Sequence, residues 1–440
     1  MKFLIKIFSP SFLLISILLL LYIFYKSEIY WNGEMRDYYF IYYFLLFLLT
    51  FLSIITFFIN QKIKEYLIIL GISLVFTLYA FEIFLNYKDI YSKEHLLKER
   101  IYEKKTGKKW DRRTSLKIYK DLKKINSDLV IGFTPNQYKK ESNTIFPLSS
   151  ISNSETLFCN ENGYYAIYQS DRYGFNNPDE EWNKNEIEYL LVGDSFTHGS
   201  CVNRPNDIAS VLRTLSNKSV LNLGSGGNGP LMEYAVLREY LNQKVKKVFW
   251  FYFEGNDLKN LEFEKRNRIL TNYLDNLNFT QNLKFRQNEI NILTIKSIED
   301  VRKKKFKKKL MYFIKLRNLR TSIISIFGAL PFEPSIENVV QPEFKEILEL
   351  TKNLTIKNNS KLYFIYLPEY NRYKVKYDNT NYNLVKNIVE YLNIPFIDVH
   401  KELFENEPNP LQLFPFELLG HYNVEGYKKV AETIFKLTKD

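Results

Sequence analysis

The stretch YLLVGDSFTHGSCV, residues 189–202, runs from apolar residues directly into Gly193, Asp194 and Ser195. An apolar run that stops at a glycine and polar residues is typical of a buried strand that ends in a loop. Parallel sheets bind ligands beyond the carboxyl ends of their strands. Ser195 is therefore a candidate nucleophile, and an ordinary turn serine is the alternative.

The chain around this stretch alternates between strand and helix patterns from residue 186 onward. The expected strands are residues 187–193, 219–224, 246–253, 361–367 and 394–399. The expected helices are residues 207–215, 231–241, 343–358, 382–392 and 424–437. Continuous apolar strands separated by helices indicate a parallel sheet that is covered on both faces. We expect a three-layer α/β/α domain over residues 185–440.

The first 86 residues contain three long apolar stretches, at about 3–25, 39–60 and 66–85. Roughly 20 apolar residues cross a bilayer as a helix, so we expect three transmembrane helices. The first stretch could instead be a cleaved signal peptide, but no small-residue cleavage site follows it before Trp31. Glu82 lies about a turn from the end of the third stretch, and we expect it to reach the membrane interface.

The basic residues near these stretches favour neither side of the membrane. An N-terminus on the inner side followed by three spans would place the soluble body outside the cytoplasm. Cys159 and Cys201 are the two cysteines, and an even pair suits an oxidising compartment. We expect a multi-pass membrane protein with an extracytoplasmic body and a possible Cys159–Cys201 disulfide. Two unpaired buried thiols are the alternative.

The net charge of +12 is concentrated in one segment, because residues 301–320 hold ten Lys and Arg and no acidic residue. Nucleic-acid binding needs a basic face across a domain, so no nucleic-acid partner is expected. The chain has no CxxC motif and no Cys/His cluster, so no metal site or other cofactor is expected. Nothing in the sequence indicates a protein partner.

Three further segments rich in polar residues and glycine are expected at the same edge of the sheet as Ser195. NLGSGGNGP (222–230) and EGNDL (254–258) follow the second and third expected strands, and GHYNVEGY (420–427) opens the last helix. A serine hydroxyl needs a base to remove its proton, and His421 is the candidate. A tetrahedral oxyanion needs fixed donors, which the Ser195 N–H, a glycine N–H and the Asn256 amide could supply.

The order of these blocks resembles that of the SGNH (GDSL-type) hydrolase family over roughly residues 185–440. GDSFTHG resembles the first block with Ser195 as nucleophile, and NLGSGGNG resembles the second with Gly227 as the oxyanion glycine and Gly226 as a close rival. GND resembles the third with Asn256 as donor, and HYNVEGY resembles the last with His421 as base. The resemblance implies a flavodoxin-like sheet. SDRYGFNNPDEEW (170–182) resembles membrane-attached members of the family.

The chain departs from the family at two positions. The family usually has an aspartate three residues before the histidine, where this chain has Leu418, so Glu417 is the candidate acid. Asp398 is a weaker candidate that we expect to cap the following loop. Glu254 stands where family members usually have glycine. Two more carboxylates are expected to support their loops: Asp194 beside the nucleophile and Asp257 beside Asn256.

A long helical insertion, at about residues 258–341, separates the third and fourth strands and contains the basic segment. Its apolar residues follow helical spacing, so the segment could lie on an anionic bilayer or pack on the domain with its lysines solvated. We expect the second arrangement. The predicted regions are thus a membrane region (1–86), a linker helix with the first part of the soluble region (87–184), and the α/β domain (185–440).

The resemblance implies a membrane-anchored serine hydrolase or O-acyltransferase that forms an acyl-serine intermediate. Its substrate would be an ester, such as an O-acetyl group, of a cell-envelope glycan or lipid. The alternative is a catalytically inactive protein of the same fold that binds a glycan or another envelope component, because the family's aspartate is missing.

Overall fold

The computed structural model describes residues 2–33, 35–90, 93–138, 145–241, 244–327 and 339–439. It forms two compact units, residues 1–93 with 304–337 and residues 94–303 with 338–440. The first part of the soluble region, from residue 94 onward, belongs to the second unit. Phe175 and Trp182 belong to the same hydrophobic core as Leu190 of the sheet, which explains this division. Residues 328–338 of the predicted insertion lie outside the described residues.

The second unit is built on a five-stranded parallel sheet with the order β5–β4–β6–β7–β8. Counted from the first of these strands, the order is 2-1-3-4-5, which is the flavodoxin-like order. The strands are β4 (Glu186–Val192), β5 (Val220–Asn222), β6 (Lys244–Phe253), β7 (Lys361–Leu367) and β8 (Phe396–Asp398). All five lie where the sequence predicts them.

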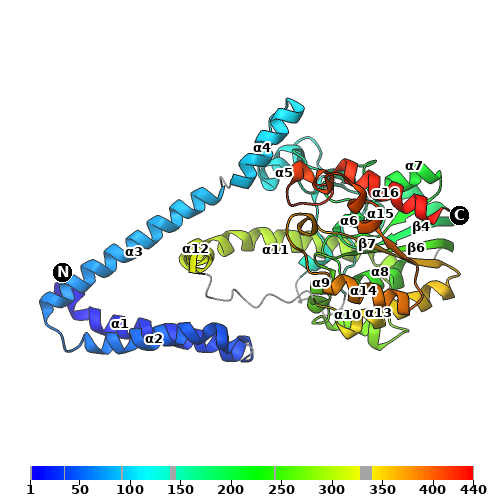
Figure 1. Cartoon of the computed structure of the whole chain (residues 1–440). Helices are drawn as coiled ribbons and strands as arrows, with labels where there is room; N and C mark the ends of the chain where they lie inside the picture. Colours follow the sequence, from blue (N-terminus) through cyan, green and yellow to red (C-terminus); the bar gives the residue numbers. More distant parts are fainter. Residues whose placement is uncertain are drawn as a thin grey trace. The chain divides into compact units, whose positions relative to one another are not determined.

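Helices cover both faces of this sheet. Because alternate side chains of a strand point to opposite faces, Trp250 and Tyr252 of β6 pack into one core and Phe251 into the other. The first core includes α8 (Pro230–Tyr240), α13 (Pro342–Lys357) and α14 (Thr380–Tyr391). The second includes α7 (Ile208–Ser216) and α16 (Val424–Thr438), as Figure 1 shows. The three-layer α/β/α prediction is confirmed.

A small second sheet lies in the N-terminal part of this unit. It has the order β1–β2–β3, with β1 (Val130–Ile131) parallel to β2 and β2 (Glu155–Leu157) antiparallel to β3 (Ile167–Gln169). The β2–β3 pair is a hairpin, and two backbone hydrogen bonds beyond the strands, Phe158 N–H to Ala166 O and Ala166 N–H to Cys159 O, extend it. The loop at its tip, residues 160–165, becomes important below.

The remaining helices of the second unit are short, apart from α11, which continues into the first unit from Lys304. Those with α-helical hydrogen bonding are α4 (Lys93–Thr106), α5 (Ser115–Lys123), α6 (Ser195–His198), α9 (Asp257–Glu264), α10 (Arg268–Asp275), α11 (Gln287–Ile314) and α15 (Val399–Glu402). The 3-10 turns are η2 (Pro135–Gln137), η3 (Asp179–Asn183), η4 (Leu283–Phe285), η5 (Tyr370–Tyr373), η6 (Phe404–Asn406), η7 (Pro410–Leu413) and η8 (Pro415–Glu417).

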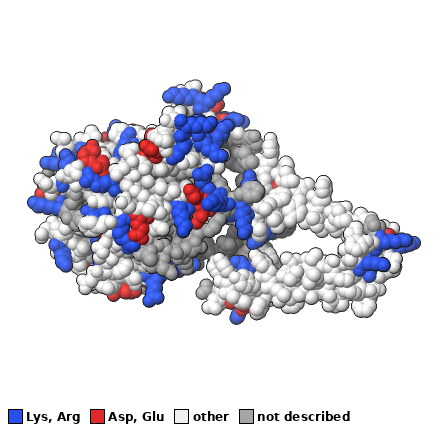
Figure 2. All heavy atoms as spheres, turned by 180° about the vertical axis from the view of Figure 1, so that it is seen from behind, with Lys and Arg blue, Asp and Glu red and all other residues white. Residues whose placement is uncertain are grey.

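The first unit contains three helices that are long and apolar enough to cross a membrane. They are α1 (Lys2–Phe24, continued by the π-helix η1, Tyr25–Tyr30), α2 (Arg36–Ile55) and α3 (Gln61–Ile90). Large apolar side chains remain exposed along them, as expected where lipid replaces water. On the face that Figure 2 shows, their length carries few charged side chains. The predicted membrane attachment rests on these helices.

Small residues hold α1 against α2. Ser9 Oγ donates to Thr56 O at 3.0 Å, and the Ser16 and Ser53 hydroxyls lie 3.4 Å apart. All four side chains are buried although most of the surrounding apolar side chains are not. Small residues and interhelical hydrogen bonds are how helices associate in lipid, where burial of apolar surface supplies little driving force.

The structure corrects two predictions about the third apolar helix and the basic segment. Glu82 does not reach an interface: it is buried, and its carboxylate accepts the backbone N–H groups of Asn318 and Leu319. These N–H groups lie in the first turn of α12 (Arg317–Phe327), which belongs to the same unit as α3 and packs on it. The free N–H groups at a helix start attract a carboxylate, which explains the contact.

Candidate active site

The turn after β4 presents Ser195 at the first position of α6. Asp194 caps this helix, because its Oδ1 accepts the Phe196 N–H at 2.8 Å. A Cβ at Gly193 would lie 2.1 Å from Thr197 Oγ1, so the turn closes only around a glycine. Ser195 is partly exposed while its neighbours on both sides are buried. The hydroxyl is therefore held in place and accessible.

His421 lies just before α16 and reaches Ser195 across the carboxyl edge of the sheet. Its Nε2 lies 2.8 Å from Ser195 Oγ, although the two residues are 226 positions apart in the chain. A base must be within hydrogen-bond distance of the proton that it removes, and this distance meets that condition. The sequence-predicted pair of Ser195 and His421 is brought together.

The carboxylate that contacts His421 is Glu161, which the sequence analysis did not single out. Glu161 Oε1 lies 3.0 Å from His421 Nδ1, and its Oε2 accepts the His421 backbone N–H at 2.7 Å. Glu161 lies in the tip of the β2–β3 hairpin. With Nδ1 facing a carboxylate, Nε2 is left to accept the proton of Ser195, which is the arrangement of a Ser–His–acid triad.

The structure places Glu417, the predicted acid, away from His421. Its carboxylate contacts the Asn409 side chain at 3.5 Å, and its backbone carbonyl accepts the Tyr370 hydroxyl. Phe416 and Glu417 both have left-handed backbone conformations, which turn the chain before it reaches the histidine. Asp398 caps α15 and accepts the Tyr382 hydroxyl, so it serves the loop as predicted.

Gly420 makes room for the acid. A Cβ at this position would lie 2.8 Å from Glu161 Oε2. A side chain at position 420 would displace the Glu161 carboxylate. Glycine at this position therefore lets Glu161 contact both His421 nitrogens.

Charge and burial act in opposite directions on the His421–Glu161 pair. Burial lowers the pKa of His421, but the hydrogen bond and charge of Glu161 outweigh it, so the pKa lies above its ordinary value. Burial raises the pKa of Glu161, and the contacts with His421 bring it below its usual range. Each partner thus stabilises the charged form of the other, as required when His421 takes a proton from Ser195.

The predicted oxyanion residues lie in the loops that follow β5 and β6. A Cβ built on Gly226 would lie 3.8 Å from Ser195 Cβ, so Gly226 borders the serine directly. Gly227 has a positive φ of 76° and packs against the Asn136 side chain. Asn256 begins α9, and its buried side-chain Oδ1 has no hydrogen-bond partner among the described residues. We treat the oxyanion-donor roles of Asn256, Gly226 and Gly227 as proposals.

The two supporting carboxylates are buried in their loops. Asp194 lies beside Ser195 Oγ at 3.3 Å, and burial raises the pKa of Asp194 to about 6. Asp257 accepts the Phe253 backbone N–H at 2.7 Å, which ties the start of α9 to the end of β6. Burial raises the pKa of Asp257 well above its ordinary value.

The segment 170–182 is joined by hydrogen bonds to α6 and to the end of β5. Asn177 exchanges hydrogen bonds with the backbone of Asn222, whose own side chain donates to Thr197 O at 2.7 Å. Asn176 donates to His198 O at 3.0 Å. Buried Asp171 organises this segment by accepting four hydrogen bonds, from the Tyr173 and Phe175 backbone, the Asn177 amide and the Trp182 indole.

His198 and Glu254, which lie near the site in the sequence, make contacts that stabilise the fold. His198 is buried between the rings of Phe158 and Tyr168, and burial lowers its pKa to about 3, so it stays neutral. Glu254, at the position where the family usually has glycine, forms a buried ion pair with Arg372. It accepts the Glu369 backbone N–H as well, at 2.8 Å. The departure at Glu254 thus serves the loop after β7.

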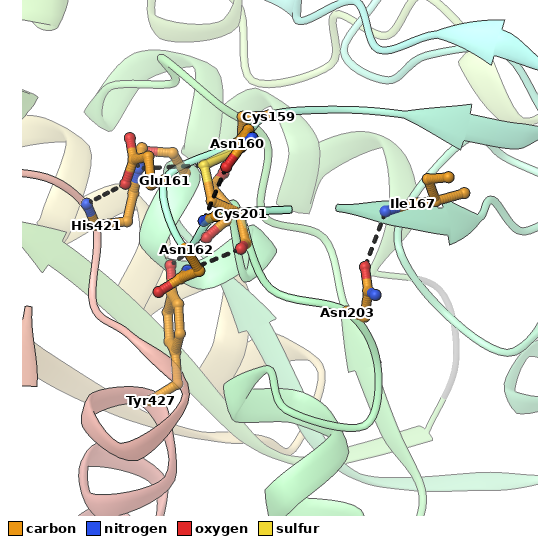
Figure 3. The surroundings of a disulfide bond; sticks show 12 residues. Cys159, Asn160, Glu161, Asn162, Ile167, Cys201, Asn203, His421 and Tyr427 are labelled. Atoms are coloured by element: carbon orange, nitrogen blue, oxygen red, sulfur yellow. Dashed lines mark hydrogen bonds and ion pairs between the residues drawn. A yellow bond between two sulfur atoms is a disulfide. The ribbon is translucent and has the colours of Figure 1, made fainter. Parts of the chain in front are cut away.

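Cys159 and Cys201 are joined by a disulfide beside the site, as Figure 3 shows. Cys201 Sγ lies 4.0 Å from His421 Nδ1. Glu161, Cys201 and His421 are close enough together to resemble a set of metal ligands. The disulfide uses the sulfur that would have to bind a metal as a thiolate, so these three residues do not form a metal site in this state.

A cavity of about 380 Å³ opens beside the oxyanion loop. Gly227, which follows Gly226 in the loop after β5, and the neighbouring Asn136 both line it. Its lining combines amide side chains, aromatic and aliphatic side chains, one arginine and one glutamate: Asn136, Tyr138, Phe146, Met232, Asn260, Phe263, Glu264, Arg266, Asn267 and Leu270. Ligand cavities are commonly of this size, with a few polar groups among apolar ones.

No model of a protein family matches the chain, and no curated protein matches it in sequence. Among solved structures it is similar to a protein from Desulfitobacterium hafniense DCB-2 described as lipolytic and of the G-D-S-L family, with 15% identity and a TM-score of 0.32. That match covers 58% of this chain and 99% of the other.

Two esterase structures are similar to the same extent. An acetyl xylan esterase has 14% identity and a TM-score of 0.29, over 57% of this chain and 100% of the other. An acetylxylan esterase from Geobacillus stearothermophilus has 14% identity and a TM-score of 0.30, over 57% and 93%. At these identities and TM-scores the similarities carry no function over to this chain.

Proposed function

We propose that the chain is a membrane-attached serine esterase or O-acyltransferase of the SGNH type. The observation that carries this proposal is the continuous contact from Ser195 Oγ through His421 to Glu161, at 2.8 and 3.0 Å. Ser195 is the nucleophile, His421 the general base and Glu161 the acid that orients His421. The alternative is an inactive binding protein of the same fold, and the contact of Glu161 with His421 Nδ1 supports the catalytic proposal over it.

The reaction proceeds in two halves. Ser195 Oγ attacks the carbonyl carbon of an ester while its proton passes to His421 Nε2. The leaving oxygen takes that proton as its bond to the acyl carbon breaks, which gives an acyl-serine. Water or a second hydroxyl group then attacks the acyl carbon while its proton passes to His421 Nε2, and His421 gives this proton to Ser195 Oγ as the acyl–serine bond breaks.

Backbone and side-chain donors stabilise the oxyanion in both halves. The Ser195 N–H, the N–H of Gly227 or Gly226 and the Asn256 amide are the proposed donors. The Asn256 Oδ1 is buried and has no hydrogen-bond partner among the described residues.

The cavity beside Gly227 is the proposed position of the non-acyl part of the substrate. Amide and guanidinium groups donate to hydroxyls, and aromatic rings pack on the faces of sugar rings, so its lining suits an O-acylated glycan of the cell envelope. The disulfide supports placing this domain in an oxidising compartment, outside the cytoplasm.

The experiment is acetate release from acetyl esters by the full-length protein in detergent, with and without a glycan that offers free hydroxyls. An esterase releases acetate in both cases, whereas a transferase forms the acetylated glycan and releases less acetate. The proposal fails if Ser195→Ala leaves the consumption of the ester unchanged.

A further inference from the structure

The Cys159–Cys201 disulfide joins the two loops that meet at His421. Cys159 is two residues before Glu161, and Cys201 is six residues after Ser195. Figure 3 shows the bond between the hairpin that carries Glu161 and the turn after α6. The bond therefore links the loop of the acid covalently to the loop of the nucleophile.

The other contacts between these loops are noncovalent, and they include the packing of the Phe158 ring on the His198 ring, with 4.8 Å between the ring centroids. Asn162 Nδ2 donates to Cys201 O at 3.0 Å, and the Ile167 N–H donates to Asn203 Oδ1 at 2.9 Å. The hairpin itself rests on strands of only three residues, β2 and β3. Inside the tip, Asn160 Oδ1 accepts the Gly163 N–H. Such local bonds shape the loop but do not fix its distance from His421.

On the basis of the proposed function, we infer that Cys159 and Cys201 are positioning residues, whose disulfide holds Glu161 against His421 and makes the catalytic rate depend on the oxidation state of the pair. A displacement of about 1 Å in a catalytic group can lower a rate by about 100-fold. Once the covalent link is broken, only noncovalent contacts such as those of Asn162 and Ile167 hold the hairpin tip near the nucleophile loop.

The chemistry of the change is thiol–disulfide exchange. A dithiol reductant transfers two electrons to the S–S bond and becomes a cyclic disulfide, and its two protons end on the Cys159 and Cys201 thiols. Cys159 is partly exposed, whereas Cys201 is buried, so a reductant attacks at Cys159.

The structure identifies the charged groups that change the pKa of His421. Glu161 from the hairpin and Asp194 from the turn after β4 raise its pKa, and burial lowers it. His198, from α6, is neutral, and Lys98 acts on the Glu161 carboxylate. If Glu161 moves away while burial persists, the pKa of His421 falls. The base must be unprotonated to act, so the acid limb of the rate profile then moves to lower pH.

The experiment compares the pH profile of ester hydrolysis by the full-length protein before and after treatment with dithiothreitol. Reduction is expected to lower kcat about 10- to 100-fold with little change in KM, and to move the acid limb to lower pH. Cys159→Ser with Cys201→Ser should reproduce both effects without reductant. General loss of folded enzyme would lower kcat and leave the position of the acid limb unchanged, which would overturn the inference.

Glu161→Gln is the decisive control. It already lacks the charge that the disulfide positions, so reduction should change its residual rate by less than about 2-fold, whereas independent effects would multiply. A further 10-fold loss on reduction of Glu161→Gln would therefore contradict the inference. An oxidised wild-type protein that consumes no ester, with or without a hydroxyl acceptor, overturns the proposed function itself. An active protein whose rate does not change on reduction overturns only the role of the disulfide.

Discussion

The residue that decides whether this site is catalytic is Glu161. Its two oxygens contact the ring Nδ1 and the backbone N–H of His421, so it fixes both the orientation of the ring and the loop that carries it. In the proposed mechanism, Glu161 from the β2–β3 hairpin therefore orients His421, although the sequence has Leu418 where the family usually has the acid.

The first prediction separates Glu161 from Glu417. Glu161→Gln should lower kcat/KM for an ester by about 100- to 10,000-fold, because His421 loses the group that holds its tautomer and stabilises its charge. Glu417→Gln, which exchanges the same groups four residues before His421, should stay within about 2-fold of wild type. A large loss in Glu417→Gln with a small one in Glu161→Gln would show that the sequence-based assignment was right.

The second prediction concerns Gly420. Gly420→Ala adds a methyl group 2.8 Å from Glu161 Oε2, so the carboxylate must move away from His421. We expect a loss of about 10- to 100-fold in kcat with a thermal midpoint close to that of wild type, because a side-chain end yields and the backbone does not. Unchanged kinetics in a folded Gly420→Ala protein would contradict the described contact.

Sequence patterns predict the part of the site that lies on the large sheet. Ser195, the glycine loop and Asn256 each follow a strand with a strong apolar pattern, and His421 opens a strongly amphipathic helix. Glu161 has no such pattern, since it lies 260 residues before His421 in the tip of a hairpin with three-residue strands. The pairing of Cys159 with Cys201 was the one signal that placed this loop beside Ser195.

At the scale of elements, the insertion between β6 and β7 serves the membrane unit as well as the sheet domain. Its helix α12 starts on the carboxylate of Glu82, and the Tyr79 hydroxyl donates to Ile314 O at 2.9 Å. The apolar spacing around residues 313–323 correctly indicates an amphipathic helix, but composition alone does not say which surface the helix covers. The buried carboxylate of Glu82 on α3 identifies α3 as the surface that α12 covers.

The third prediction tests this contact. Glu82→Leu should loosen α12 by about 1–2 kcal/mol, since two backbone N–H groups lose a charged acceptor. The measurement is the cross-linking yield between cysteines introduced at Tyr79 and Phe313, whose rings lie 5.3 Å apart. Glu65→Leu on the same helix is the control and should leave the yield unchanged. Equal yields in all three proteins would contradict the role of Glu82.

At the scale of the whole molecule, the chain combines a membrane unit with a soluble α/β domain whose two cysteines are paired. Three membrane crossings from an inner N-terminus would put this domain outside the cytoplasm. The disulfide agrees with that side, because cytosolic thiols are kept reduced.

The fourth prediction follows from this orientation. In intact cells, a membrane-impermeant maleimide should label the protein only after treatment with an impermeant reductant, and Cys159→Ser with Cys201→Ser should abolish labelling. Labelling without reductant, and only after the cells are opened, would instead place the domain in the cytoplasm with free thiols.

The central claim is that Ser195 is a nucleophile activated by His421 and Glu161. Reaction of the purified full-length protein with a fluorophosphonate probe, followed by mass spectrometry of its peptides, tests it most directly. We predict that the probe attaches to the peptide containing Ser195, fails to react with Ser195→Ala and His421→Ala, and reacts slowly with Glu161→Gln. A folded wild-type protein that does not react, or one that reacts equally well without His421, would contradict the claim.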